Sequence, residues 1–172
     1  MRPIRNIGIR SIIPPYMLEE IAKRGKPHQR DWALTNLASA GFIRGQRYAM
    51  GVLPFYPENY GAMCGASRMS VPLCEAAEQK GYSRDLCSYA LTDIGSSLTG
   101  KGPLGKLPKP DFMVCGNNIC GTVIKWYEIQ ARAFNVPVFF FDTPFVHDQI
   151  EEHTLKYVHN QFKEYISFLE KQ

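Results

Sequence analysis

The stretch from Asp111 to Trp126 constrains the fold more than any other part of this chain. It opens with a short apolar run, Phe112–Val114, which is typical of a buried strand. Gly116 and the two asparagines that follow it favour a turn. Apolar residues then recur every four positions, as on one face of a helix: Ile119, Val123, Tyr127 and Ala131. A strand, a tight turn and a helix in this order are typical of α/β proteins, which bind ligands at the carboxyl edge of their sheet.

Two further apolar runs predict strands at residues 51–56 and 136–141. Pro54 places the first near a sheet edge, and the second is predicted to be buried on both faces. Helices are predicted at residues 16–24, 31–50, 60–68, 72–80 and 83–98 and at the C-terminus. Strands that alternate with helices predict an α/β fold, a Rossmann-like three-layer sandwich with a short parallel sheet.

The predicted elements divide the chain into three segments. Residues 1–49 form a basic extension with N-terminal helices, and residues 50–146 form the α/β domain. Residues 147–172 form a long amphipathic C-terminal helix, which is expected to connect to a further domain.

Composition narrows the classes of function. The chain has 172 residues and a net charge of +4 from scattered basic residues, so nucleic-acid binding is not indicated. No apolar run approaches the roughly 18 residues that a membrane span needs, and no apolar segment follows the charged start as in a signal peptide. We therefore predict a cytoplasmic protein that binds neither nucleic acid nor membrane.

Cysteine is the residue type that points most directly to chemistry. An odd number of five in a cytosolic-looking chain predicts thiols that are buried, reactive or metal-bound rather than disulfides: Cys64, Cys74, Cys87, Cys115 and Cys120. No pair has C-x-x-C spacing. The common phosphate-loop, dinucleotide and zinc-protease signatures are also missing from the sequence.

Three polar segments are predicted at turns or helix starts beside strands, and they contain Glu58, Cys87 and Cys120. In a parallel sheet such loops can share one edge, which would bring a carboxylate and two thiolates into one crevice. Each residue also has a structural explanation. Glu58 can be a first-turn carboxylate that the helix dipole favours, and the two cysteines can be buried small side chains.

Several motifs resemble, in the right order, the 2-hydroxyacyl-CoA dehydratase family, which also contains subunits of the bacterial ATP-dependent benzoyl-CoA reductases. The resemblance runs from about Asn36 to the end of the chain. It depends on these segments: F-Y-P-E-N-Y-G-A-M-C-G-A, G-Y-S-R-D-L-C-S-Y-A, D-F-M-V-C-G-N-N-I-C-G-T-V-I-K-W-Y-E and V-P-V-F-F-F-D-T-P.

The resemblance implies a subunit that holds a [4Fe-4S] cluster through three cysteines and leaves one iron open to the thioester carbonyl of an acyl-CoA. Thiolates are the soft ligands that such clusters require, and an iron without a protein thiolate can act as a Lewis acid. In this family an ATP-dependent iron–sulfur activator injects one electron and a ketyl radical forms on the substrate. Dehydratases then eliminate water, whereas benzoyl-CoA reductases reduce the aromatic ring.

Residue by residue, the resemblance implies that Cys87 and Cys120 are two of the cluster ligands. It implies that Glu58 handles protons at the substrate. The third ligand is left open between a second domain, which family subunits carry, and Cys64 or Cys115. The expected partners are the acyl-CoA substrate, a paralogous subunit and the activator.

Two other classes of function compete with this enzymatic interpretation. The chain could be a non-catalytic α/β docking module without a cluster, or a small-ligand α/β enzyme whose thiols are incidental. Colour after anaerobic purification with iron and sulfide separates these hypotheses, because a thiolate-bound cluster absorbs visible light.

Overall fold

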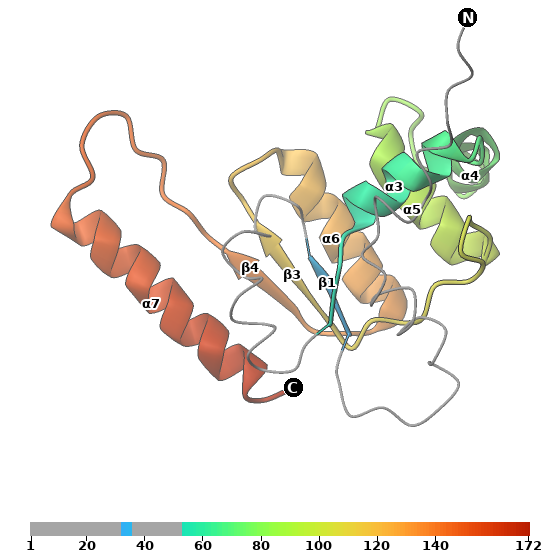
Figure 1. The fold of residues 1–172 in the computed structure, drawn as a ribbon. Helices are drawn as coiled ribbons and strands as arrows, with labels where there is room; N and C mark the ends of the chain where they lie inside the picture. The colour runs from blue at the N-terminus through green and yellow to red at the C-terminus, as the bar shows by residue number, and fades with distance from the viewer. Residues whose placement is uncertain (1–31, 36–52) are drawn as a thin grey trace, which may run out of the picture. The chain divides into compact units, whose positions relative to one another are not determined.

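The computed structural model describes residues 32–35 and 53–172, and the chain forms two compact units (Figure 1). In the described part, unit 1 contains Pro57–Pro108 and unit 2 contains two short N-terminal strands together with Lys109–Gln172. The helix expected at residues 16–24 lies outside the described residues. The division into segments 1–49, 50–146 and 147–172 stays a prediction.

Unit 2 is built on a parallel sheet, as the sequence predicts. In the described residues its strands are β1 (Trp32–Thr35), β2 (Leu53–Phe55), β3 (Phe112–Gly116) and β4 (Val138–Phe141), in the spatial order β2-β1-β3-β4. β1 pairs with both β2 and β3, and β3 pairs with β4. β2 is an edge strand, which is where a strand proline is tolerated.

The helix predicted at residues 31–50 is wrong where the structure describes it. Trp32–Thr35 is β1, an interior strand, with Leu34 in register with Phe55 on one side and with Met113 on the other. Pairing along both edges satisfies the backbone groups of this short segment, and such tertiary context overrides a local helical spacing.

Helix α6 (Gly121–Phe134) follows β3 and contacts β3 and β4. Three of its predicted core residues, Val123, Tyr127 and Ala131, are buried. Ile119 precedes the helix and is exposed, so the predicted helix start is two residues too early. Asn135 closes the helix in the left-handed conformation, with φ of 51°, which asparagine tolerates better than most residues.

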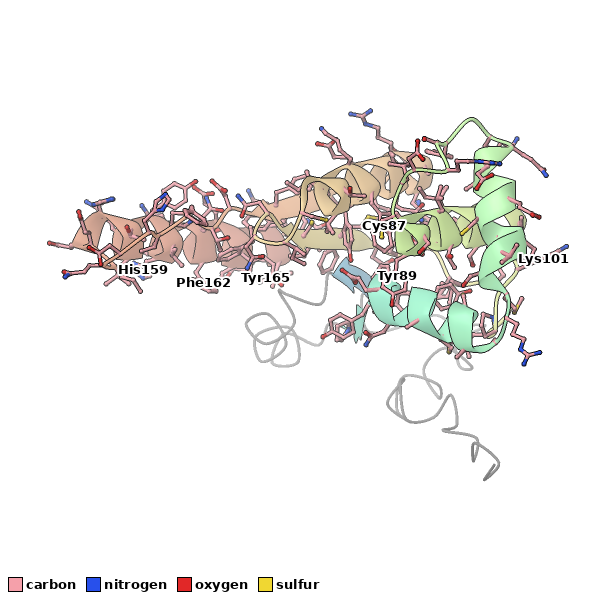
Figure 2. All side chains as sticks on the ribbon, turned by 90° about the horizontal axis from the view of Figure 1, so that it is seen from above. Cys87, Tyr89, Lys101, His159, Phe162 and Tyr165 are labelled. Atoms are coloured by element: carbon pink, nitrogen blue, oxygen red, sulfur yellow. The ribbon has the colours of Figure 1, made fainter. Side chains whose placement is uncertain are left out.

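Helix α7 (Glu152–Leu169) packs its apolar side on β3 and β4. Tyr165 and Leu169 join Phe112, Val114 and Phe141 in one buried cluster. On α7, Phe162 and Tyr165 lie on the same side of the helix (Figure 2), and the Phe162 ring centroid is 4.8 Å from that of Phe141. The helix expected from residue 147 therefore begins at residue 152 and covers part of the sheet.

β4 departs from its prediction in one respect. The run at residues 136–141 was expected to be buried on both faces, but only Phe141 is buried and the other three strand residues are half-buried. Unit 2 is thus a parallel sheet with helices packed against it. The Rossmann-like three-layer arrangement stays a prediction.

Unit 1 is helical in its described part. It consists of α3 (Pro57–Ala66), α4 (Ser70–Glu78) and α5 (Ser88–Thr99). The helices pack closely at glycines: a Cβ built on Gly95 would lie 1.9 Å from the Leu73 carbonyl oxygen, and one on Gly61 would lie 2.9 Å from the Tyr89 ring. Glycine at these two positions therefore allows the helices to pack closely.

The starts of two helices in unit 1 differ from the predictions. α3 begins at Pro57 rather than at residue 60, because proline is well suited to the first helical position. α5 begins at Ser88 rather than just after Ser83. The Ser83 hydroxyl instead accepts a hydrogen bond of 3.2 Å from the Asp85 N–H, which closes a turn before the helix.

Among the described helices, none has both the length and the apolar character needed to cross a membrane.

Candidate functional site

Cys87 is the residue immediately before α5, at the N-cap position (Figure 2). Its carbonyl oxygen accepts the first helical hydrogen bond, 3.0 Å from the Leu91 nitrogen. Its side chain makes no capping hydrogen bond, and the residue is exposed and not in a disulfide. The thiol is therefore held at the positive end of a helix, on the surface of unit 1.

Cys120 occupies the same position on α6. It is the N-cap residue, with extended backbone, and its carbonyl oxygen lies 3.1 Å from the Val123 nitrogen. Its thiol is also exposed, free and not used to cap the helix. Both predicted ligand cysteines thus present exposed, unengaged thiols at helix N-termini.

Glu58 lies in the first turn of α3 and is half-buried. A carboxylate at this position is favoured by the helix dipole, which is the structural explanation considered for it above. Three residues further on, Gly61 packs on Tyr89, which lies two residues after Cys87. The starts of α3 and α5 therefore come close together, and both Glu58 and Cys87 belong to unit 1.

Cys120 belongs to unit 2, so the predicted meeting of Cys87 and Cys120 stays a prediction. Within the described residues, no group of three or more histidine, cysteine or acidic side chains is arranged to hold a metal ion.

The two cysteines that were left open as the third cluster ligand lie in buried surroundings that do not suit an iron ligand. Cys64 and Cys115 are both completely buried. Burial raises the pKa of the Cys64 thiol from 9.0 to about 11, which disfavours the thiolate that binds iron. The Cys115 thiol donates to the Gly116 carbonyl at 3.4 Å. Neither residue offers an accessible thiolate.

Cys74 is half-buried in the structure. Its sulfur lies 3.4 Å from the Thr92 hydroxyl and 3.7 Å from the Ser88 carbonyl oxygen. These two contacts place it beside the first turns of α5, where it acts as a small packing and hydrogen-bonding group.

A polar network at the carboxyl ends of β3 and β4 was not among the predicted site residues. The Asn117 side-chain oxygen accepts hydrogen bonds from the N–H and the hydroxyl of Thr143, both at 2.9 Å. The Asn117 amide group donates to the carboxylate of Asp142. One side chain therefore ties the end of β3 to the residues that follow β4.

Helix α7 completes this network. The Tyr157 hydroxyl donates to the second carboxylate oxygen of Asp142, and the Gln161 side-chain oxygen accepts from the Asp142 N–H at 3.3 Å. The hydrogen bond to Asp142 raises the pKa of Tyr157. The sequence signal was present, since polar residues directly follow two strands that are neighbours in a parallel sheet.

A shallow pocket of about 500 Å³ lies in unit 2, between the end of β4 and the first turn of α7. Its lining includes Phe145, His147 and His153. His147 stacks edge-on against Phe145 at 4.5 Å, and His153 pairs with Glu151 at 3.1 Å. These side chains are exposed.

Comparison with known proteins places most of the chain in one family. The model of the family described as 2-hydroxyglutaryl-CoA dehydratase, D-component, matches residues 47–172. This range contains Glu58, Cys87 and Cys120.

Curated relatives carry related descriptions. The (R)-2-hydroxyisocaproyl-CoA dehydratase alpha subunit of Clostridioides difficile is 45% identical over 116 residues, which are 67% of this chain and 28% of that protein. The (R)-phenyllactyl-CoA dehydratase alpha subunit of Clostridium sporogenes is 36% identical over 122 residues, 70% of this chain and 30% of that protein.

A reductase is also similar. One benzoyl-CoA reductase subunit of Thauera aromatica is 31% identical over 113 residues, 63% of this chain and 26% of that protein. The chain therefore spans less than a third of the length of each of these three relatives.

Proposed function

Because the chain belongs to the 2-hydroxyglutaryl-CoA dehydratase D-component family, we propose that it forms part of a subunit of a 2-hydroxyacyl-CoA dehydratase. The observation that supports this most directly is the pair of exposed, unengaged thiols at two helix N-termini inside the matched range. Dehydration is preferred over aromatic ring reduction because the dehydratase subunit from C. difficile is 45% identical and the reductase subunit is 31% identical.

The residues present fit a thiolate-bound iron–sulfur cluster. Cys87 and Cys120 would each supply one ligand, since both thiols are exposed and each lies at a helix N-terminus that favours negative charge. When bound, the [4Fe-4S] cluster would supply Lewis-acid contact with the thioester carbonyl and transfer of one electron. The third ligand would come from neither Cys64 nor Cys115, because both are buried.

Glu58 is proposed to take and return a proton at the substrate. It lies in the first turn of α3, and a glutamate side chain can accept and donate a proton. The packing of Gly61 on Tyr89 brings the start of α3 close to the start of α5, so Glu58 and Cys87 belong to one compact unit.

Two of the relatives named above are alpha subunits and the third is also described as a subunit, so we propose that this chain works with a paralogous partner. An ATP-dependent activator would deliver the electron. The cytoplasm is the proposed location, since free thiols persist where glutathione and thioredoxin keep them reduced.

Iron uptake by the full chain tests the proposal. The chain is reconstituted anaerobically with iron and sulfide, alone and with a family-length dehydratase partner subunit, and iron per chain and visible absorption are measured. We expect Cys87→Ser and Cys120→Ser each to lose most of the iron and colour that the wild type binds. Cys74→Ser is the matched control, because serine can keep the hydrogen bond to Thr92, and it should retain both.

A colourless wild type in both preparations would contradict the cluster and favour a docking module without one. Iron that persists in both Cys87→Ser and Cys120→Ser would contradict the ligand assignment.

A further inference from the structure

The polar network of Asn117, Asp142, Thr143 and Tyr157 lies at the end of β3, three residues before Cys120. We propose that Asn117 and Asp142 are positioning residues that hold the link between β3 and α6, and so fix where Cys120 presents its thiol. The proposal rests on the proposed role of Cys120 as a ligand.

The link is short and is held at both ends. It consists of residues 117–120, between the end of β3 at Gly116 and the start of α6 at Gly121. At the helix end, the Cys120 carbonyl accepts from the Val123 N–H at 3.1 Å. At the strand end, the Asn117 N–H donates to the Phe141 carbonyl at 3.2 Å, which extends the pairing of β3 with β4.

Side-chain bonds add to this backbone bond at the strand end. Asn117 uses its oxygen for both donors of Thr143 and its amide group for Asp142. Only Asn118 and Ile119 then remain between the two anchors, and both are exposed. Because two residues span the gap, the position of Asn117 largely determines that of Cys120.

The chemistry of the network assigns different roles to the two side chains. Asp142 accepts one hydrogen bond at each carboxylate oxygen, from Asn117 and from Tyr157. Asp142→Asn leaves one acceptor oxygen, so both bonds survive only if the Tyr157 hydroxyl turns to accept from the new amide group, and both then lose the charge of the carboxylate. Asn117→Asp removes the donor to Asp142 and sets one carboxylate against another.

Swapping the two side chains between positions 117 and 142 provides a donor and an acceptor for every hydrogen bond of the network. In the double variant Asn117→Asp/Asp142→Asn, the carboxylate at position 117 accepts from Thr143 and from the new amide group. The amide oxygen at position 142 accepts from Tyr157. A network that acts through these hydrogen bonds is therefore rescued by the exchange, whereas a requirement for each residue by itself is not.

The experiment measures the mobility of residues 117–120 and the accessibility of the Cys120 thiol, in the full chain without iron. Hydrogen exchange of the peptide that covers residues 117–123 is measured together with the alkylation rates of Cys120 and Cys87 by mass spectrometry. We expect Asn117→Asp to speed exchange in this peptide by about tenfold, as for one or two lost hydrogen bonds, and Asp142→Asn to speed it by about threefold, because its bonds are weakened rather than lost. The Cys120 alkylation rate should change several-fold, and the Cys87 rate should not.

Two controls separate positioning from general loosening. Asn118→Ala alters an exposed residue of the same link outside the network, and it should leave both readouts at wild-type values. The double variant should return both readouts to within about twofold of the wild type. An Asn117→Asp variant that exchanges and alkylates as the wild type does, or a double variant no better than Asn117→Asp, would overturn the proposal.

Iron uptake distinguishes this proposal from the proposed function. If single variants respond and the exchange rescues them, but the wild type binds no iron, the proposed function fails and the network still positions Cys120. If iron uptake falls in the single variants and returns in the double variant, both are supported.

Discussion

The chain segments that precede Cys87 and Cys120 differ, although both residues occupy the N-cap position of a helix. Both cysteines are N-cap residues with exposed, unengaged thiols. Cys120 follows a buried strand and a link held by partly buried side chains, Asn117 and Asp142. Cys87 follows an exposed turn, in which Ser83 bonds to Asp85 and the Leu86 N–H donates to the Ser83 carbonyl at 3.1 Å.

The difference shows that one local geometry can have two physical origins. The position of Cys120 is set by tertiary structure, because its anchors come from β3, β4 and α7. The position of Cys87 is set by the local turn and by the packing of α5 on α3 and α4. We therefore expect Cys120 to respond to changes in the core of unit 2 and Cys87 to changes in the helix packing of unit 1.

Removing the Tyr165 side chain should have the largest effect. This side chain is completely buried and packs on Phe139 and Phe141, so Tyr165→Ala should destabilise unit 2 by about 4 kcal/mol. Urea denaturation measures the loss, and hydrogen exchange should quicken around Cys120 but not around Cys87. Ile166→Ala, at the partly exposed neighbouring position, should cost less than about 1 kcal/mol. Equal losses for the two variants would contradict the assignment of the core.

The next largest effect is expected at Gly95, in unit 1. A Cβ there would lie 1.9 Å from a backbone oxygen of α4, so Gly95→Ala must separate α4 from α5 at a cost of about 3 kcal/mol. Thermal unfolding measures this cost, and exchange should now quicken around Cys87. Gly65→Ala is the control, since its Cβ would meet only the Ser70 hydroxyl, at an ordinary 3.6 Å. A stable Gly95→Ala variant would show that the helices are not in close contact.

Alkaline pH should weaken unit 1. Burial raises the pKa of Cys64 from 9.0 to about 11 and that of Tyr60 from 10.0 to about 12. Their unfolded forms therefore lose protons first, so stability falls as pH rises from about 9 to about 12, by on the order of 1–2 kcal/mol. Melting temperature against pH measures the fall. In Tyr60→Phe the part above pH 10 should flatten, and an unchanged profile would rule out the tyrosine as its source.

The smallest effect is expected at the turn before Cys87. Ser83→Ala removes two exposed hydrogen bonds between the Ser83 hydroxyl and Asp85, at 3.2 and 3.5 Å, and should cost about 0.5 kcal/mol. Alkylation of Cys87 should change less than twofold, in contrast to the several-fold change expected for Cys120 when Asn117 is altered. A large response of Cys87 would mean that this turn determines its position as strongly as the network does for Cys120.

How far the sequence predicts the structure differs between elements. The strand–turn–helix at residues 111–126 could be predicted, since apolar spacing changes sharply at the Gly116 turn. Trp32–Thr35 was predicted to be helical, because the pairing that makes it a strand comes from β2 and β3, which lie far away in sequence. The burial of β4 was overestimated, since apolar composition alone does not say which faces are covered.

In the candidate site, too, some features can be predicted from local sequence and others depend on contacts between distant residues. Motifs mark Cys87 and Cys120 as candidate ligands, which stays a prediction, and the structure adds that both are N-cap residues. The bonds of Asn117 to Asp142 and Thr143 join residues that are 25 and 26 positions apart. No local sequence pattern reveals which of these residues bond to each other. Polar residues that follow neighbouring parallel strands indicate only that their side chains share one edge of the sheet.

The strand order has a consequence for how the chain folds during synthesis. β1 must pair with β3, yet all of Pro57–Pro108 lies between β2 and β3 in the sequence. Helices α3, α4 and α5 can therefore associate as soon as they leave the ribosome, because their contacts are local. Until β3 has been synthesised, the edge of β1 that pairs with β3 has no partner strand. During this interval the edge is accessible to chaperones.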